Sequence, residues 1–140
     1  FSDFLAYQEK PGSPLVCGSP ASFELRYETR PGDRAQNVHV SIGIYTLLDE
    51  NVLYLSNDLV GAEFSDLPER ASFICHIDKL PLAAATYSIN LYCTVNGTLA
   101  DWVIDAARIS VEQGDYFGTG RLVPSTHSKI LVPHTWQVEI

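Results

Sequence analysis

Residues 38–48, 86–96 and 103–112 carry aromatic, amide, hydroxyl and guanidinium side chains at every second position. If the three segments are strands lying side by side, these positions share one outward face, which Asp101 and Trp102 adjoin from a loop. Aromatic rings stack on the apolar C–H faces of sugars, while the polar groups bond sugar hydroxyls. The sequence therefore predicts a carbohydrate-binding face. Its candidate residues are His39, Ser41, Tyr45, Asn90, Tyr92, Asp101, Trp102 and Arg108.

A simpler interpretation of the same residues stays open. A solvated sheet face is polar in any case, and tyrosine is favoured in strands whether or not a ligand binds there. On this interpretation the domain is a structural sandwich that dimerises or docks a partner protein through its C-terminal tail.

Signatures of catalysis and of cofactor binding are weak in this sequence. The glycines at 114–120 lack the GxGxxG order of a phosphate loop, and no GxSxG elbow occurs. A carboxylate pair could hydrolyse glycosides, but most acidic residues lie in turns such as Asp49-Glu50. We expect no enzymatic activity, no cofactor and no metal site, since the histidines are scattered. The four histidines are His39, His76, His127 and His134.

Charge and composition narrow the classes of partner. The 140 residues carry a formal net charge of −8, which disfavours binding to nucleic acid and to anionic membrane surfaces. No apolar run approaches the ~20 residues of a membrane-spanning helix. Three cysteines, an odd number without CxxC spacing, favour a reducing compartment, although one buried disulfide stays possible.

The elements that would position the face are strands. Apolar residues alternate with polar ones through 23–28, 38–45, 72–77 and 87–96, as in sheets with one buried side. Turn residues separate the runs, and Asn96-Gly97 is a strong hairpin signal. Residues 1–140 are therefore predicted to form a single all-β domain. We expect an antiparallel two-sheet β-sandwich of immunoglobulin-like or jelly-roll type with seven to nine strands.

The last quarter of the chain has a different character. The glycine-rich break at 114–120 is followed by an apolar, extended tail that includes Ile130–Pro133 and Trp136–Val138. Such a tail must be buried on its own domain or on a partner. Because exchange of a terminal element is a common route to twofold association, we predict a homodimer.

Several segments also resemble a known family. They are Val38–Leu48 with Asp49, Leu80–Leu82 leading to Thr86–Ile89, Asp105–Val111 with Gly118, the GTG at 118–120, and the LVPHTW at Leu131–Trp136. Together they resemble the C-terminal carbohydrate-binding domain of the ATPase subunit (Wzt) of bacterial O-antigen polysaccharide ABC transporters.

The resemblance implies a function and a cellular setting. Members recognise the non-reducing, often capped, end of a lipid-linked polysaccharide at the cytoplasmic face of the inner membrane, and so couple its completion to export. They follow an ATPase domain, which acts with the membrane subunit of the transporter, and they form dimers that exchange C-terminal strands. If this function holds, we expect Tyr45, Tyr92 and Trp102 of the predicted face to stack on sugar rings. The hydrogen-bonding residues are His39, Asn90, Asp101 and Arg108.

Overall fold

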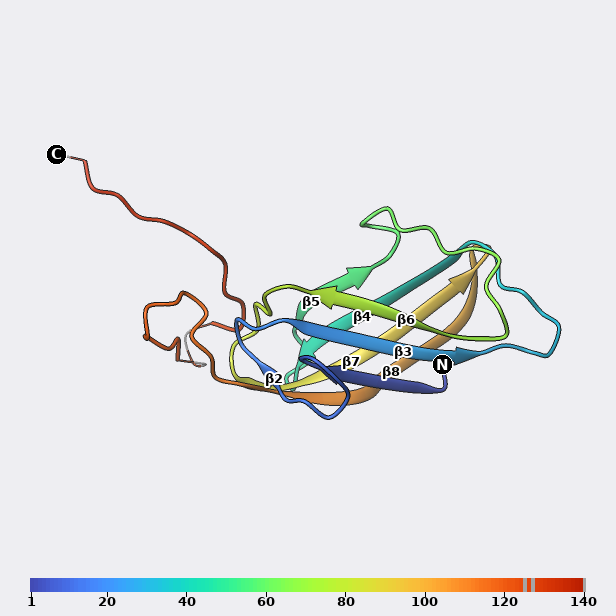
Figure 1. Ribbon diagram of the computed structural model, residues 1–140, viewed down its shortest axis with the longest axis horizontal. Coiled ribbons are helices and arrows are strands. Elements are labelled where there is room, and N and C mark those ends of the chain that lie inside the picture. The colour runs from blue at the N-terminus through green and yellow to red at the C-terminus, as the bar shows by residue number, and fades with distance from the viewer. Residues whose placement is uncertain (125, 127, 140) are drawn as a thin grey trace.

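The structure, a computed structural model, describes residues 1–124, 126 and 128–139, so His127 lies outside the described residues (Figure 1). The described residues form strands, turns and extended segments, and none of them is helical. No segment of this part of the chain could therefore span a membrane as a helix. The strands are β1 (Asp3–Tyr7), β2 (Leu15–Val16), β3 (Ala21–Glu28), β4 (Val38–Thr46), β5 (Asn51–Ser56), β6 (Arg70–Ile77), β7 (Ala85–Val95) and β8 (Thr98–Glu112).

These strands form two sheets that pack face to face (Figure 1). One sheet has the order β1-β3-β6, and the other has the order β2-β8-β7-β4-β5. Every pairing is antiparallel except that of the two-residue strand β2 with β8. The prediction of an all-β, antiparallel two-sheet sandwich is confirmed.

The core lies between the sheets and is built from alternate residues of each strand. Burial alternates along β3 and β7, which confirms the period-two prediction for these segments. The Tyr87 hydroxyl donates a 2.6 Å hydrogen bond to the Ala83 carbonyl, and burial raises the pKa of Tyr87 to about 12. The largest fully buried side chains are Tyr87, Phe23, Leu25, Ile44, Leu80, Leu82 and Ile89.

The long β7–β8 hairpin supports much of the larger sheet. Its turn is Asn96-Gly97, with φ angles of 52° and 78°. Two successive residues at positive φ match the twist of the flanking strands, which is why Asn-Gly is favoured in two-residue hairpin loops. The hairpin predicted at this position is confirmed.

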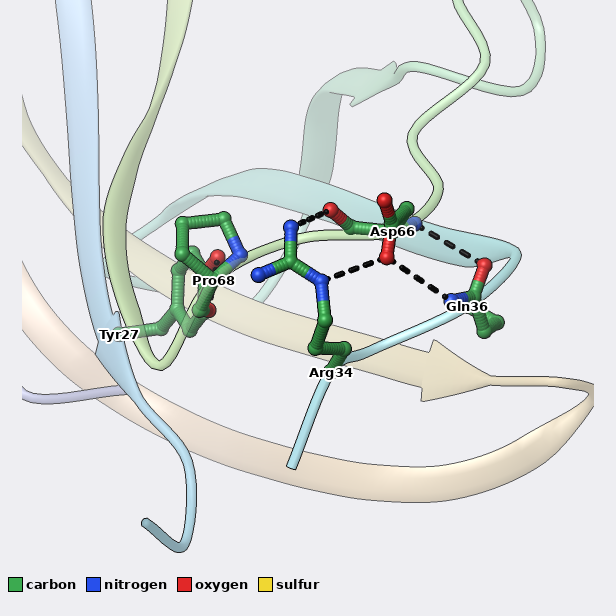
Figure 2. A network of polar contacts seen from close by, with 5 residues as sticks. All are labelled: Tyr27, Arg34, Gln36, Asp66 and Pro68. Atoms are coloured by element: carbon green, nitrogen blue, oxygen red, sulfur yellow. Dashed lines mark hydrogen bonds and ion pairs between the residues drawn. The ribbon is translucent and has the colours of Figure 1, made fainter. Parts of the chain in front are cut away.

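At one end of the sandwich, a polar clamp joins the loop after β3 to the loop before β6 (Figure 2). Arg34 donates from Nε to the Asp66 carboxylate and from Nη2 to the Asp66 carbonyl, both at 2.6 Å. Gln36 accepts from the Asp66 backbone N–H at 3.0 Å, and the Tyr27 hydroxyl donates to the Pro68 carbonyl at 2.9 Å. The Arg34 guanidinium, by hydrogen bond and charge, lowers the pKa of Asp66.

This clamp predicts a pH-dependent contribution to stability. Because the folded-state pKa of Asp66 lies below its unfolded value, the contribution is present above the unfolded pKa of about 3.9. It is lost as the pH falls through the lower, folded-state pKa. Arg34→Ala should therefore lower the melting temperature slightly at pH 7, and the difference from the unmodified protein should shrink in acid to what the bond to the Asp66 carbonyl contributes.

Arg30→Ala is the matched control, since the exposed Arg30 side chain has no ion pair among the described residues. Thermal melts between pH 2 and pH 7 measure both variants. A difference for Arg34→Ala that grew as the pH fell would contradict the assignment.

The chain leaves the sandwich through its C-terminal segment. Ile130 bridges to Leu82, and the Leu131 N–H donates to the Pro81 carbonyl at 2.8 Å. Beyond that point the tail runs away from the sheets (Figure 1), with Trp136 90% exposed and Val138 exposed. Leu131 is buried, but the tail beyond it is not buried within one protomer.

Candidate functional site

The outer face of the five-stranded sheet brings most of the predicted residues together. Register pairs Tyr92 of β7 with Ser41 of β4 on one side and with Trp102 of β8 on the other. The same register places Ser88 between Tyr45 and Arg108. Neighbouring strands lie about 4.8 Å apart, so these residues form adjacent rows of one surface.

Tyr92 and Trp102 form an aromatic pair on this face. Their ring centroids lie 6.1 Å apart with an interplanar angle of 79°, and Trp102 is 59% exposed. The placement of Trp102 in a loop was wrong, because β8 begins at Thr98 and carries Trp102 within the sheet. The hairpin turn is shorter than that prediction assumed, and Trp102 consequently lies directly across from Tyr92.

Two further tyrosines extend the aromatic surface toward β5. A Cβ atom added to Gly43 would lie 2.8 Å from Cε1 of Tyr45, so the Tyr45 ring leans over the glycine. Gly43 pairs with Tyr54, whose side chain is 56% exposed. Tyr54 was missed by the sequence analysis, which considered three strands only. The signal that could have identified it is that Tyr54 lies in a run of strand-favouring residues ending at Ser56.

A β-bulge in β8 creates a polar cluster beside the aromatic residues. Between the pairs Ile89–Ala107 and Leu91–Val103, Asn90 alone faces the three residues 104–106. Asp105, at the centre of the bulge, has a φ of 52°, and its N–H donates to Asn90 Oδ1 at 2.8 Å. Such bulges redirect a side chain out of the regular alternation.

The carboxylate of Asp105 is the hub of this cluster. It accepts a 2.7 Å hydrogen bond from the Ser88 hydroxyl and two 3.4 Å bonds from Nε and Nη2 of Arg108. The Ser88 hydroxyl and, after it, the Arg108 guanidinium lower the pKa of Asp105. The carboxylate is therefore ionised at neutral pH.

Asp101 does not belong to this face. It pairs with the buried Cys93, and its carboxylate binds the amino group of Phe1, between the two sheets. The prediction that Asp101 adjoins the outer face was wrong because residues 101 and 102 point to opposite sides of the same strand.

Two predicted residues, Ser41 and His39, contribute less to the exposed centre of this face. Ser41 points outward by register, but its side chain is buried, with Tyr92 and Ser56 as its cross-strand neighbours. His39 lies at the end of the face, where its Nε2 is 3.6 Å from Asp58 Oδ1.

The outer face of the three-stranded sheet has a different chemistry. Arg26 pairs with Glu24 at 3.0 Å, and Arg70 pairs with Glu28 at 3.4 Å. Ion pairs of this kind are typical of a solvated surface and contribute little to stability. The exposed aromatic rings of the sandwich strands gather instead on the five-stranded sheet.

Other concave regions fit a sugar less well. A groove of about 350 Å³ opens between the edges of β5 and β6, where Leu59, Val60 and Ile74 are exposed. Its lining is largely apolar, so it offers few partners for sugar hydroxyls. Within the described ranges, no three His, Cys, Asp or Glu side chains lie close enough to hold a metal ion.

A family model and a solved structure point to the same protein family. No curated protein matches the sequence. A solved structure described as the crystal structure of the C-terminal domain of wzt is similar in fold, with a TM-score of 0.72 at 13% identity. The similarity covers 98% of this chain and 81% of that chain. The model of the Wzt C-terminal domain family matches residues 3–122. The chain therefore belongs to the Wzt C-terminal domain family.

Proposed function

We propose that this chain is a non-catalytic carbohydrate-binding module that recognises the non-reducing end, capped or uncapped, of a lipid-linked O-antigen polysaccharide. The observation that carries the proposal is the exposed Tyr92–Trp102 pair beside the Asp105–Arg108 cluster. Rings that stack on C–H surfaces and charged groups that bond hydroxyls are the two elements that a sugar site needs.

Individual roles follow from the geometry. Tyr92 and Trp102 are the stacking surface, and Tyr45 extends it over Gly43. Arg108 bonds hydroxyls together with Asp105, which the sequence analysis did not single out. Asn90 is chiefly a positioning residue, because its amide oxygen holds the bulge.

The setting proposed for this module is a longer transporter protein. In it, the module follows an ATPase domain on the cytoplasmic side of the inner membrane, and glycan binding is coupled to export through the membrane subunit. Family membership supports this setting.

Retention of O-polysaccharides tests the proposal. The 140-residue chain is applied to an array of lipid-free bacterial O-polysaccharides, each presented intact and after enzymatic removal of its terminal residue. We expect retention of one or a few intact glycans and loss of retention after trimming. A chain that binds no glycan contradicts the function, and binding that survives trimming contradicts end recognition.

We also propose a homodimer that associates through the C-terminal tail. The exposed apolar side chains of Trp136 and Val138 would be stabilised by burial against a second protomer. His134, nearer the sandwich, already packs on Phe117 with ring centroids 5.2 Å apart. Truncation after His134 removes the two exposed apolar side chains and spares this contact. We expect light scattering to show that the truncated chain is a monomer. Its melting temperature should equal that of the full 140-residue chain diluted until it too is monomeric.

Gln137→Ala is the control for the tail, since Gln137 is polar and bonds only Glu139 among the described residues. It should leave the dimer intact. If the full chain is already monomeric at high concentration, the dimer proposal fails.

A second candidate function is a structural sandwich that docks a partner protein through this tail. The same exposed tail favours it. It predicts that Tyr92→Ala and Trp102→Ala have no effect on any binding activity of the chain, while the truncation abolishes association.

A further inference from the structure

We infer that Asp105 and Arg108 form a specificity element that selects a neutral sugar, bonded through neighbouring hydroxyls, over a terminus carrying phosphate or carboxylate. The inference rests on the proposed function and adds the chemical class of the sugar. It concerns the cluster held by the β8 bulge, on the face that also carries Tyr92 and Trp102.

The position of the Asp105 carboxylate is fixed before any ligand arrives. The residue has a φ of 52°, in the left-handed region, and the Asn90 side chain accepts its N–H at 2.8 Å. Ser88 donates to Oδ1 at 2.7 Å. A group held by backbone geometry and by two neighbouring side chains loses little further freedom on binding.

The two charges of the cluster compensate each other. Arg108 reaches Oδ1 through Nε and Oδ2 through Nη2, each at 3.4 Å. The guanidinium is therefore not a free cation that awaits an anionic cap. Among the described residues, Nη1 of Arg108 has no bond, and the side chains of Asp105 and Arg108 are 48% and 59% exposed.

A pair of neighbouring hydroxyls fits this arrangement. One hydroxyl can donate to Asp105, while the next accepts from a free N–H of Arg108, because each hydroxyl is both donor and acceptor. Bonds to charged groups are roughly twice as strong as bonds between neutral ones. Asp105 and Arg108 then both bond the sugar while the ion pair between them stays intact.

An anionic group meets two obstacles at the same place. It must compete with Asp105 for Arg108, and it must approach an ionised carboxylate, which repels it. The chain as a whole adds to this repulsion with its formal net charge of −8. The cluster thus discriminates by attraction to hydroxyls and by repulsion of anions.

The aromatic pair lies at a distance suited to the next part of the same glycan. Ser88, which contacts Asp105, and Tyr92 are four residues apart on β7, or roughly 13 Å at the rise of a strand. A sugar at Asp105 and a sugar stacked on Tyr92 and Trp102 are therefore different units of one chain.

The first test compares two variants on the O-polysaccharide array, sorted by neutral or anionic terminal residue. Asp105→Asn and the control Glu112→Gln each remove one carboxylate charge from β8, so their net charges match. We expect the unmodified chain to retain neutral-ended glycans, Asp105→Asn to weaken retention at least tenfold, and Glu112→Gln to leave it unchanged. Circular dichroism confirms that both variants fold.

The second test needs no cognate glycan. Methyl phosphate, the smallest phosphate monoester probe, is added while the Arg108 Nε–H resonance is followed by NMR. In the unmodified chain we expect no saturable shift at tens of millimolar. In Asp105→Asn we expect a shift, because the freed guanidinium becomes available to the anion.

Three results overturn the inference. They are retention of anionic-ended glycans by the unmodified chain, retention of neutral glycans that Asp105→Asn leaves unchanged, and a saturable methyl phosphate shift in the unmodified chain. Failure to retain any glycan has a different meaning. It removes the proposed function itself, and the inference with it, whatever the Arg108 resonance shows.

Discussion

Replacing Trp102 by alanine should weaken binding of the cognate O-polysaccharide fragment roughly tenfold or more. The side chain is 59% exposed and edge-to-face with Tyr92, so a stacked sugar would cover both rings. Truncation of an aromatic anchor at the centre of an interface costs about 2 kcal/mol or more, and 1.4 kcal/mol is tenfold in affinity. Titration calorimetry with a soluble, monovalent fragment measures the effect.

Trp136→Ala is the matched control, because the sequence has two tryptophans and Trp136 is also exposed. A monovalent fragment is insensitive to dimerisation, so this variant should bind as the unmodified chain does. Trp102→Ala should also keep the melting temperature nearly unchanged, since little buried surface is lost. Equal affinities for Trp102→Ala and the unmodified chain would exclude this surface as the stacking site.

Replacing Leu25 by alanine should destabilise the fold by about 2–5 kcal/mol, the usual range for a buried leucine. Leu25 is 1% exposed and lies on β3, where its inward position faces the opposite sheet. The loss combines the transfer of apolar atoms with the cavity left behind. Because domains of this kind are stable by only ~5–15 kcal/mol, denaturant unfolding should show a clear fall in midpoint.

Leu48→Ala provides the comparison within the same residue type. Leu48 is 84% exposed in the turn after β4, so its removal should change stability by no more than about 0.5 kcal/mol. Similar losses for the two variants would mean that β3 does not face the core as described.

The strands of this fold could be predicted from the sequence because their alternation is local. Phe23 and Leu25 on β3, and Ile89 and Leu91 on β7, are buried as the period of two requires. The β7–β8 turn was also predictable, since Asn-Gly favours positive φ at both positions. Each of these features is determined within a few residues.

The site was only partly predictable because it depends on the register between strands. At the bulge, extra residues of β8 lie opposite Asn90 alone. The alternation within 103–112 does not reveal at which residue of the neighbouring strand this change of register occurs. Asp105 was therefore overlooked. Asp101 was misplaced for another reason, because residues 101 and 102 were expected in a loop, whereas they alternate sides within β8. The parallel pairing of the two-residue β2 with β8 is equally invisible in a single sequence, because it too is a long-range contact.

Amide NMR shifts during titration with the retained O-polysaccharide test the central claim most directly. The account predicts that the shifts concentrate on the outer face of the five-stranded sheet, around Tyr92, Trp102 and Asp105. Shifts confined to the outer face of the three-stranded sheet would contradict it. The residues that would report that outcome are Glu24, Arg26 and His76.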